Sequence, residues 1–330
     1  MLRVSGGARS AGVPVVPARG KELGLSQGKI SRFFAMFFGI KLSRGGSCQI
    51  MLRAGERCES NYQAIVKRVQ QSSWIVPDET GWTSASSVEP RIGGNLAWLH
   101  TAVSEDAVAY LIARARGLEA SARLIGADYP GKLIHDGWAS YDRFCRATHQ
   151  TCLAHLLRRC RELLETATRG AVIFPRKVKA LLQESLQVRD LRDARKITLR
   201  AARAKADDLQ ERMMKLVTPV KTHAANQRFC RHLLRHADQL FTFLRYQGID
   251  ATNFRAEQAI RPADFGELSR AVVNRKVWGG NRTEAGASAQ SILMTLLFTA
   301  LKRGQDAMAF MTQVLQAPPA HRPLLIPDSG

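Results

Sequence analysis

The chain has 330 residues, with 49 Lys and Arg against 28 Asp and Glu, a formal net charge of +21 and a pI near 10.4. This length can bury a full hydrophobic core, and 45% apolar residues exclude an intrinsically disordered protein. Basic surfaces bind phosphate backbones, so the charge favours an acidic polymer such as nucleic acid as partner. A basic, merely solvated surface is the alternative.

The cysteine pattern and the apolar runs bear on the compartment. Six cysteines occur without a Cys-x-x-Cys pair, which favours a reducing, cytoplasmic setting. The most apolar early run, 33–40, is far shorter than the roughly 20 residues that a membrane helix needs. The first residues also lack the pattern of a secretion signal. We therefore expect a cytoplasmic protein without a membrane span.

The first part of the chain is expected to be irregular and then helical. Residues 1–22 show neither helical nor strand periodicity, which predicts a disordered lead-in. In the region 23–73, Ser26 can cap a first helix, Gly39 would end it, and a second helix would begin near Ser43. Two short helices around a glycine are compatible with a helix-turn-helix, and equally with a plain helical hairpin.

Strands and helices then alternate in a pattern typical of a mixed sheet. The predicted elements are a helix over 60–72, strands over 74–76, 98–103 and 107–113, a helix over 117–125, and strands over 132–134 and 150–153. A polar turn, Ser104-Glu105-Asp106, separates the second strand from the third. The order predicts an α/β fold with a mixed five-stranded sheet and flanking helices.

A long basic region follows the predicted strands. Residues 156–246 read as helix almost throughout and contain 21 Lys and Arg against 9 Asp and Glu. Apolar residues recur there near helical spacing, as at Val178, Leu181, Leu182, Leu186 and Leu191. This predicts a packed helical insertion with a basic outer face. A final region, 247–315, begins with a helix that Thr252 or Asn253 can cap, and residues 316–330 form a tail.

Three carboxylates stand at positions that suit metal-dependent phosphoryl transfer. Asp78 closes a predicted strand within VPDETGW, Asp136 closes another within LIHDGWASY, and Glu257 lies on a helix within ATNFRAEQAIRP. Two Mg²⁺ or Mn²⁺ ions about 3.5–4 Å apart need such hard oxygen ligands on rigid elements. Taken singly, the aspartates are ordinary turn formers and the glutamate is an ordinary salt-bridge acid, so only the combination indicates a site.

Five segments carry a resemblance to a known family. They are VPDETGW, HDGWASYDRF, TCLAHLLR, ATNFRAEQAIRP and GGNRTEAGASAQSILMTLL. In order and spacing they resemble the catalytic-core motifs of the insertion sequence 66 family of bacterial transposases, from about residue 25 to about residue 315. The resemblance implies a ribonuclease H-like core over 74–155 and 247–315, interrupted by the all-α insertion, with Asp78, Asp136 and Glu257 as catalytic metal ligands.

The resemblance also implies an activity and partners. It implies a DNA transposase that uses two Mg²⁺ or Mn²⁺ ions to cleave DNA and transfer strands of an insertion sequence. Its partners would be double-stranded DNA at element ends and target, further copies of the chain on DNA, and accessory proteins of the element, in the bacterial cytoplasm at the nucleoid. Family members usually carry a longer amino-terminal part with DNA-recognition elements, so we expect a truncated copy.

Further residues are expected to support the site. Cys152 and His155 form a C-x-x-H pattern, and similar motifs in several transposase groups support the active site. A buried cysteine and a satisfied histidine are the alternative. Asn253 and Arg261 each lie four residues from Glu257, which predicts that they orient it or touch a phosphate. Helix capping and simple ion pairing are the alternatives.

A basic loop and several tryptophans complete the candidate residues. The loop around Gly279-Gly280 is predicted to bind DNA through Arg275, Lys276, Asn281 and Arg282, with a plain glycine turn as the alternative. The tryptophans that can stack on bases or belong to the core are Trp82, Trp98, Trp138 and Trp278. Two other functions stay open: a ribonuclease H-like nuclease without strand transfer, and a truncated, non-catalytic DNA-binding remnant.

Overall fold

The computed structural model describes residues 25–82, 97–260, 280–281 and 283–326. The chain divides into two compact units, the first formed by residues 1–127 and 255–330 and the second by residues 128–254. Strands pair antiparallel in the first unit and parallel in the second, so the described residues form a mixed α/β fold with five strands, as predicted. None of the described helices combines the length and apolarity that a membrane-spanning helix needs.

The first unit begins with helices whose ends are set by local side chains. These are α2 (Gln27–Phe38), α3 (Arg44–Arg57) and α4 (Glu59–Gln70). Ser26 Oγ accepts from the Lys29 N–H (3.3 Å), and Ser43 Oγ accepts from the Gly46 N–H (2.9 Å). Gly39 ends α2 with a left-handed φ of 64°. The predicted cap at Ser26, the predicted break at Gly39 and the predicted helix start near Ser43 are confirmed.

The sheet of the first unit is an antiparallel meander. Its strands are β1 (Trp74–Trp82), β2 (Ala97–Val103) and β3 (Val108–Ala113). β1 pairs with β2 from Val76 opposite Val103 to Trp82 opposite Ala97. The prediction that Asp78 ends its strand is therefore wrong, and so is its interpretation as a turn residue. Pairing with β2 along the whole of 78–82 overrides the local turn propensity of Asp-Glu-Thr-Gly.

Different helices cover the two faces of this sheet. On one face, α5 (Leu118–Ile125) lies near His100, whose Nδ1 is 3.4 Å from Ser121 Oγ. The other face carries α11 (Phe254–Ile260), where the Tyr110 hydroxyl donates to the Ala259 carbonyl (2.9 Å). His100 and Tyr110 lie on opposite faces because residues of adjacent pleats alternate in direction along paired strands.

A row of hydroxyl groups on α13 (Glu284–Lys302) closes the free edge of β3. Each accepts a backbone N–H: Ser291 from Ile112 (2.9 Å), Thr295 from Tyr110 (2.9 Å) and Thr299 from Val108 (3.1 Å). Four residues of helix span about 6 Å and two residues of strand about 6.8 Å, so the two spacings match. An edge strand with its N–H groups occupied does not pair with another chain.

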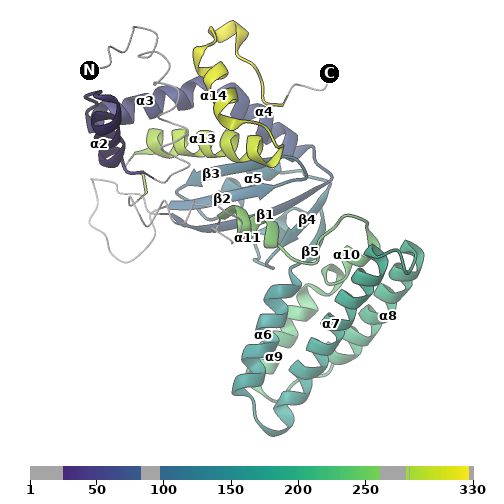
Figure 1. The fold of residues 1–330 in the computed structure, drawn as a ribbon. Coiled ribbons are helices and arrows are strands. Elements are labelled where there is room, and N and C mark those ends of the chain that lie inside the picture. The colour runs from purple at the N-terminus through teal and green to yellow at the C-terminus, as the bar shows by residue number, and fades with distance from the viewer. Residues whose placement is uncertain (1–24, 83–96, 261–279, 282, 327–330) are drawn as a thin grey trace. The chain divides into compact units, whose positions relative to one another are not determined.

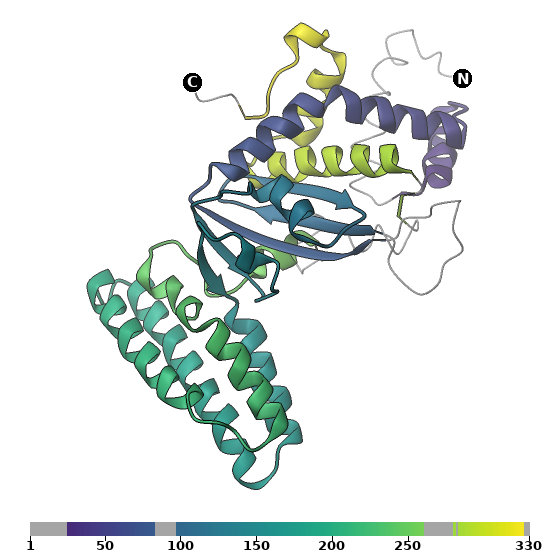
Figure 2. The ribbon, with the colours of Figure 1, turned by 180° about the vertical axis from the view of Figure 1, so that it is seen from behind.

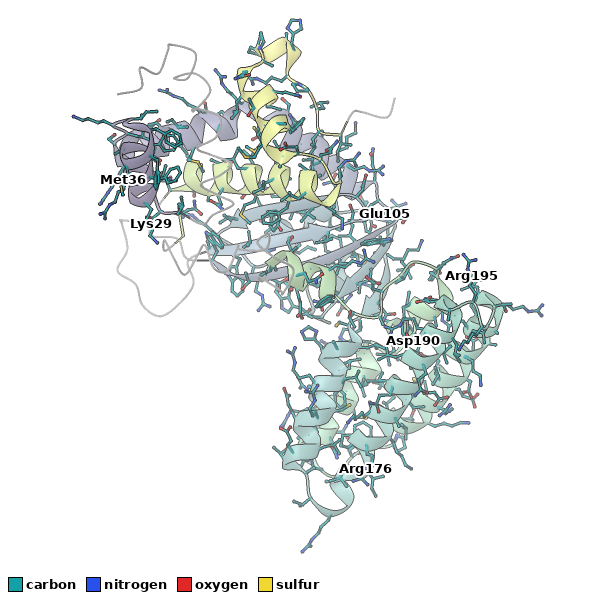
Figure 3. The ribbon with its side chains drawn as sticks, in the orientation of Figure 1. Lys29, Met36, Glu105, Arg176, Asp190 and Arg195 are labelled. Atoms are coloured by element: carbon teal, nitrogen blue, oxygen red, sulfur yellow. The ribbon has the colours of Figure 1, made fainter. Side chains whose placement is uncertain are left out.

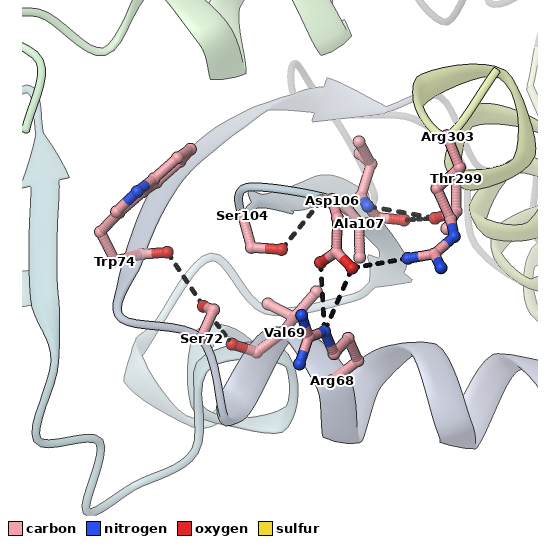
Figure 4. Close-up of polar contacts among 10 residues, drawn as sticks. Arg68, Val69, Ser72, Trp74, Ser104, Asp106, Ala107, Thr299 and Arg303 are labelled. Atoms are coloured by element: carbon pink, nitrogen blue, oxygen red, sulfur yellow. Dashed lines mark hydrogen bonds and ion pairs between the residues drawn. The ribbon is translucent and has the colours of Figure 1, made fainter. Parts of the chain in front are cut away.

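The β2–β3 turn is held by two arginines. Glu105 is exposed at its tip, as Figure 3 shows, whereas Asp106 points into the unit (Figure 4). Arg68 Nε lies 3.2 Å from both Asp106 carboxylate oxygens, and Arg303 Nη1 lies 2.5 Å from Oδ2. Burial alone would raise the pKa of Asp106, but the two guanidinium groups outweigh burial and lower that pKa. The predicted turn is confirmed.

Helices α3 and α13 run side by side and approach closely, as both views of the ribbon show (Figures 1 and 2). A Cβ added to Gly55 would lie 2.8 Å from the Ala289 Cα, which no ordinary packing allows. Two small residues therefore set the distance between these helices. The last described helix of this unit is α14 (Ala307–Gln316), capped by Asp306.

The second unit combines a parallel strand pair with long helices. Its elements are β4 (Lys132–His135), β5 (Thr148–Thr151), α6 (Leu153–Thr166), α7 (Ile173–Asp193), α8 (Leu199–Val217), α9 (Ala224–Arg235) and α10 (Thr242–Arg245). Short 3₁₀ turns occur at Tyr141–Arg143, Arg169–Val172 and Ala237–Gln239, and at Pro319–His321 in the first unit. Helices α6 to α9 lie alongside one another (Figure 2).

Two details of the predicted helical region differ from the structure. Leu153, predicted to lie in the fifth strand, is the first residue of α6, because β5 ends at Thr151. Leu191, predicted to belong to the core, is 42% exposed, whereas Val188 one turn earlier is buried. The apolar stripe of α7 includes Val178, and it turns away from Leu191 near the end of the helix.

Candidate active site

Asp78 lies in the middle of β1 on the face that carries α11. Its side chain is partly buried, and Oδ1 accepts from the Glu79 N–H (2.9 Å). In the strand register, Asp78 is opposite Thr101 of β2, and Thr101 is opposite Tyr110 of β3. Side chains of directly opposed residues project from the same face of an antiparallel sheet. Asp78 therefore shares a face with Tyr110, whose hydroxyl bonds to α11.

The neighbouring carboxylate, Glu79, has a different role. Its side chain points to the opposite face, is only 2% exposed, and pairs with Arg116 (2.8 Å). The Arg116 guanidinium in turn lies 4.7 Å from the centre of the Trp98 ring. Glu79 thus forms an ion pair that joins β1 to the segment after β3, whereas Asp78 lies on the sheet face that carries α11.

Glu257 lies on α11, and two contacts fix this helix to the sheet. The Arg255 guanidinium is 5.0 Å from the centre of the Trp74 ring, and the Tyr110 hydroxyl bonds to the Ala259 carbonyl. Trp74 and Asp78 are four residues apart on β1, so they share a face. The helix that carries Glu257, which is partly buried, therefore packs on the sheet face that bears Asp78.

Asp136 belongs to the second unit and directly follows β4. Its Oδ1 accepts from the Trp138 N–H (2.8 Å), and Gly137 between them has a φ of 89°. A Cβ on Gly137 would lie 3.2 Å from His232 Cε1. The prediction of a turn at Asp136-Gly137 is confirmed, and only glycine suits its central position. The turn fixes the direction of the Asp136 carboxylate.

A chain of hydrogen bonds between two histidines supports this turn. The Phe144 carbonyl can only accept, so the proton of the bond to His149 (3.1 Å) is on His149 Nε2. His149 Nδ1 then accepts from His135 Nε2–H (2.9 Å), and His135 Nδ1 accepts from the Gly137 N–H (3.1 Å). Both rings are neutral in this arrangement. Burial lowers the pKa of His135 and of His149, which keeps them neutral at pH 7.

Two further histidines pack around the Asp136 turn. The His232 and His236 rings are 4.7 Å apart, one turn from each other on and just after α9. Burial, followed by the charges of His236, Arg159 and Arg235, lowers the pKa of His232 to about 4. We did not predict this histidine cluster, although the four-residue spacing of His232 and His236 indicates a shared helix face.

The predicted supporting residues that the structure describes lie at the starts of two helices, α6 and α11. Cys152 is buried, and its N–H donates to the His135 carbonyl (2.7 Å), so it adjoins the residue before Asp136. His155 lies in the first turn of α6 and is partly exposed. Asn253 directly precedes α11 and is buried, and its Oδ1 has no hydrogen-bond partner among the described residues, so this oxygen does not cap the helix.

The predicted DNA-binding loop falls largely outside the described residues. The structure does not describe three residues of this loop, Arg275, Lys276 and Arg282. Trp278 and the predicted supporting residue Arg261 also lie outside the described residues. Asn281 is described and buried: it accepts from the Trp82 indole N–H (2.9 Å) and donates to the Gly286 carbonyl (2.9 Å). This bridge joins the end of β1 to the start of α13. Contact of Asn281 with DNA stays a prediction.

The tryptophans divide between core and surface. Trp82 is fully buried, which confirms its interpretation as a core residue. Trp98 is partly exposed and covered by Arg116, and Trp138 is partly exposed with its ring edge against Tyr141 (5.9 Å between centres). Stacking on a base remains a prediction for these two residues.

The donor chemistry of the three carboxylates suits a hard divalent cation. Asp78 is held by a paired strand, Asp136 by a fixed turn and Glu257 by an anchored helix, and all three offer oxygen ligands. Within each unit, the described residues contain no group of three or more His, Cys, Asp or Glu side chains placed to hold a metal ion. Since Asp136 belongs to the second unit and the other two to the first, their common site stays a prediction.

The chain matches a known protein family. The family model described as "Transposase IS66 family" matches residues 23–289, which is most of the chain. Among curated proteins, none matches the chain. The matched range includes β1, the Asp136 turn and α11.

Proposed function

Because the chain belongs to the IS66 family of transposases, we propose that it cleaves DNA at the ends of an insertion sequence and joins those ends to target DNA. The family match over residues 23–289 carries the proposal, since it spans all three candidate carboxylates. The packing of α11 supports it, because the helix of Glu257 contacts Tyr110 and Trp74 on the sheet face that also bears Asp78. We further propose a ribonuclease H-like core with a helical insertion.

In the proposed site, the chain's own residues bind and orient. Asp78, Asp136 and Glu257 supply carboxylate oxygens, and Oδ1 of Asp136 is oriented by the Trp138 N–H. When bound, two Mg²⁺ or Mn²⁺ ions would polarise the phosphodiester and activate the attacking oxygen. The first attack by water frees a 3′-hydroxyl, and attack by that hydroxyl on target DNA forms a new P–O bond while the old one breaks.

The basic composition supports DNA as the substrate. Forty-nine Lys and Arg against 28 Asp and Glu favour binding to a phosphate backbone. We propose that double-stranded DNA at the element ends and at the target is bound in turn, by several copies of the chain and with accessory proteins of the element, at the bacterial nucleoid. The residues Arg275, Lys276, Asn281 and Arg282 are our candidates for DNA contact, and Cys152, His155, Asn253 and Arg261 are our candidates for support of the active site.

The test compares two adjacent carboxylates of β1. Purified full-length chain is incubated with Mg²⁺ or Mn²⁺, supercoiled plasmid, and a labelled duplex that ends in a free 3′-hydroxyl. We expect nicking and joining by the unchanged protein and loss of both, by about 10³-fold or more, in Asp78→Asn, Asp136→Asn and Glu257→Gln. Glu79→Gln is the matched control, because that carboxylate faces the other side of the sheet and pairs with Arg116.

The same experiment separates the competing functions. Hydrolysis without joining of the supplied 3′-hydroxyl end would indicate a nuclease on the same core and would refute strand transfer. Binding of DNA that is indifferent to metal and to Asp136→Asn, with neither nicking nor joining, would indicate a non-catalytic DNA-binding protein. Loss of activity in Glu79→Gln equal to that in Asp78→Asn, with both variants folded, would contradict the assignment of roles on β1.

A further inference from the structure

The second unit has an open cavity at one end of its long helices. It has a volume of about 780 Å³ and lies where the α6–α7 connection meets the α8–α9 connection. Its lining includes the cations Arg169, Lys177, Lys215 and Lys221, together with His223, and it includes no Asp or Glu. Such a lining is selective for a negatively charged ligand.

The four cations of this cavity differ in the partners that they contact. Lys215 pairs with Glu211 (2.6 Å), but both side chains are about 70% exposed, so water screens the pair. The Lys221 ammonium lies 5.0 Å from the centre of the Phe174 ring, which holds its stem in place. Arg169 and Lys177 are exposed and make no ion pair with any carboxylate of the described segments. Their charge is therefore available to a ligand.

The rim and the floor of the cavity also indicate the kind of ligand. Ile173 and Val220 are 53% and 83% exposed at its edge, which suits the apolar faces of a sugar. Below them, His223 Nδ1 and Asn226 Oδ1 are buried, and neither has a hydrogen-bond partner in the part of the chain that the structure describes. Polar groups or water molecules that enter with a ligand can satisfy such atoms. Charged groups beside apolar and polar ones match a nucleotide backbone.

We propose that this cavity, hereafter the α7 cavity, binds the phosphodiester backbone of double-stranded DNA. Duplex DNA is a dense row of phosphates, and the two exposed cations with no ion pair among the described residues, Arg169 and Lys177, would each contact one of them. The proposal rests on the proposed function, because transposition makes DNA the polyanion that the chain meets. It adds a DNA contact on the second unit that involves none of the three carboxylates.

The test removes charge from the α7 cavity and, in a matched variant, from the other end of α7. Arg169→Asn with Lys177→Gln is compared with Arg195→Asn and Lys196→Gln. Arg169 and Arg195 both have a left-handed backbone, with φ of 50° and 56°, which asparagine tolerates. Arg195 follows the far end of α7, a 21-residue helix about 31 Å long, whereas Arg176 marks the cavity end (Figure 3).

Binding of a fluorescein-labelled 30-base-pair duplex is measured by anisotropy, with EDTA present, between 0.05 and 0.2 M KCl. Each lost phosphate contact lowers the slope of log affinity against log salt by about 0.9, which is about eightfold in affinity at 0.1 M salt. For the cavity variant, which loses two cations, we therefore expect this slope to fall by about 1.8 and the affinity to fall by up to about 60-fold. The Arg195 and Lys196 variant is expected to keep the slope, and Lys177→Arg is expected to bind as the unchanged protein does.

Several outcomes would overturn the proposal. Equal losses in the two double variants would show that only overall charge matters, and no loss in the cavity variant would show that DNA binds elsewhere. Release of the duplex by 20 mM inorganic phosphate, but not by KCl of equal ionic strength, would indicate a site for free phosphate. A loss restricted to duplex RNA would indicate a different partner. If the unchanged protein binds no DNA, the proposed function fails first, which distinguishes the two failures.

Discussion

Replacing Thr295 by valine tests whether the hydroxyl row of α13 stabilises the edge of β3. Thr295 Oγ1 accepts from the Tyr110 N–H at 2.9 Å, and both residues are fully buried. Valine has nearly the same shape but no acceptor, so the Tyr110 N–H is left buried without a partner. An unsatisfied buried donor costs about 1–3 kcal/mol, so the free energy of unfolding should fall by that amount.

The assay is urea unfolding followed by circular dichroism, with hydrogen exchange of the peptide that contains Tyr110 as a local readout. Thr295→Ser is the matched control, since it keeps the hydroxyl and loses one methyl group, at a cost of about 0.8 kcal/mol. We expect faster exchange at Tyr110 in the valine variant only. If Thr295→Val is as stable as the unchanged protein and Tyr110 exchanges equally slowly, the reasoning about this edge is wrong.

Three further predictions concern packing, the α11 anchor and pH. Gly55→Ala should lower the free energy of unfolding by about 1–3 kcal/mol in urea titration, because its Cβ would meet Ala289, and an unchanged midpoint would contradict this. Tyr110→Phe removes the bond to α11 and should reduce strand joining more than it reduces DNA affinity, so equal losses would argue against an anchoring role. Burial lowers the pKa of His100 and of His135, whereas unfolded histidines titrate near 6.5, so the unfolded chain takes up protons that the folded chain does not. Stability should therefore fall as the pH drops below about 6.5, by about 1.4 kcal/mol per pH unit for each proton, and a flat or opposite trend in urea unfolding would refute it.

Features set by neighbouring residues could be predicted from the sequence. The cap at Ser26, the break at Gly39 and the helix start near Ser43 depend on a few consecutive residues, and all three are confirmed. The turn at Asp136 is of the same kind, because its hydrogen bond spans two residues. The order and spacing of five motif segments also indicated the family, which the family match confirms.

Features set by distant partners could not be predicted in this way. Asp78 looked like a turn residue because its neighbours favour turns, but pairing with Thr101 on β2 decides its conformation. The bond between His135 and His149 depends on the parallel register of β4 and β5. Likewise, nothing local in the sequence indicates that the hydroxyls of α13 match the spacing of β3.

The register of β1 decides which of two chemically similar side chains is presented to α11. Asp78 and Glu79 differ by one methylene group, yet one faces α11 and the other is locked to Arg116. Slippage of β1 by one residue would exchange their faces, because the side-chain period of a strand is two. A single-codon deletion between Trp74 and Asp78 would then put Glu79 where Asp78 stands, Asp78 at the buried position of Pro77, and Thr80 at the position that pairs with Arg116. The assignment of roles to these two acids thus depends on the register of β1 as well as on their chemistry.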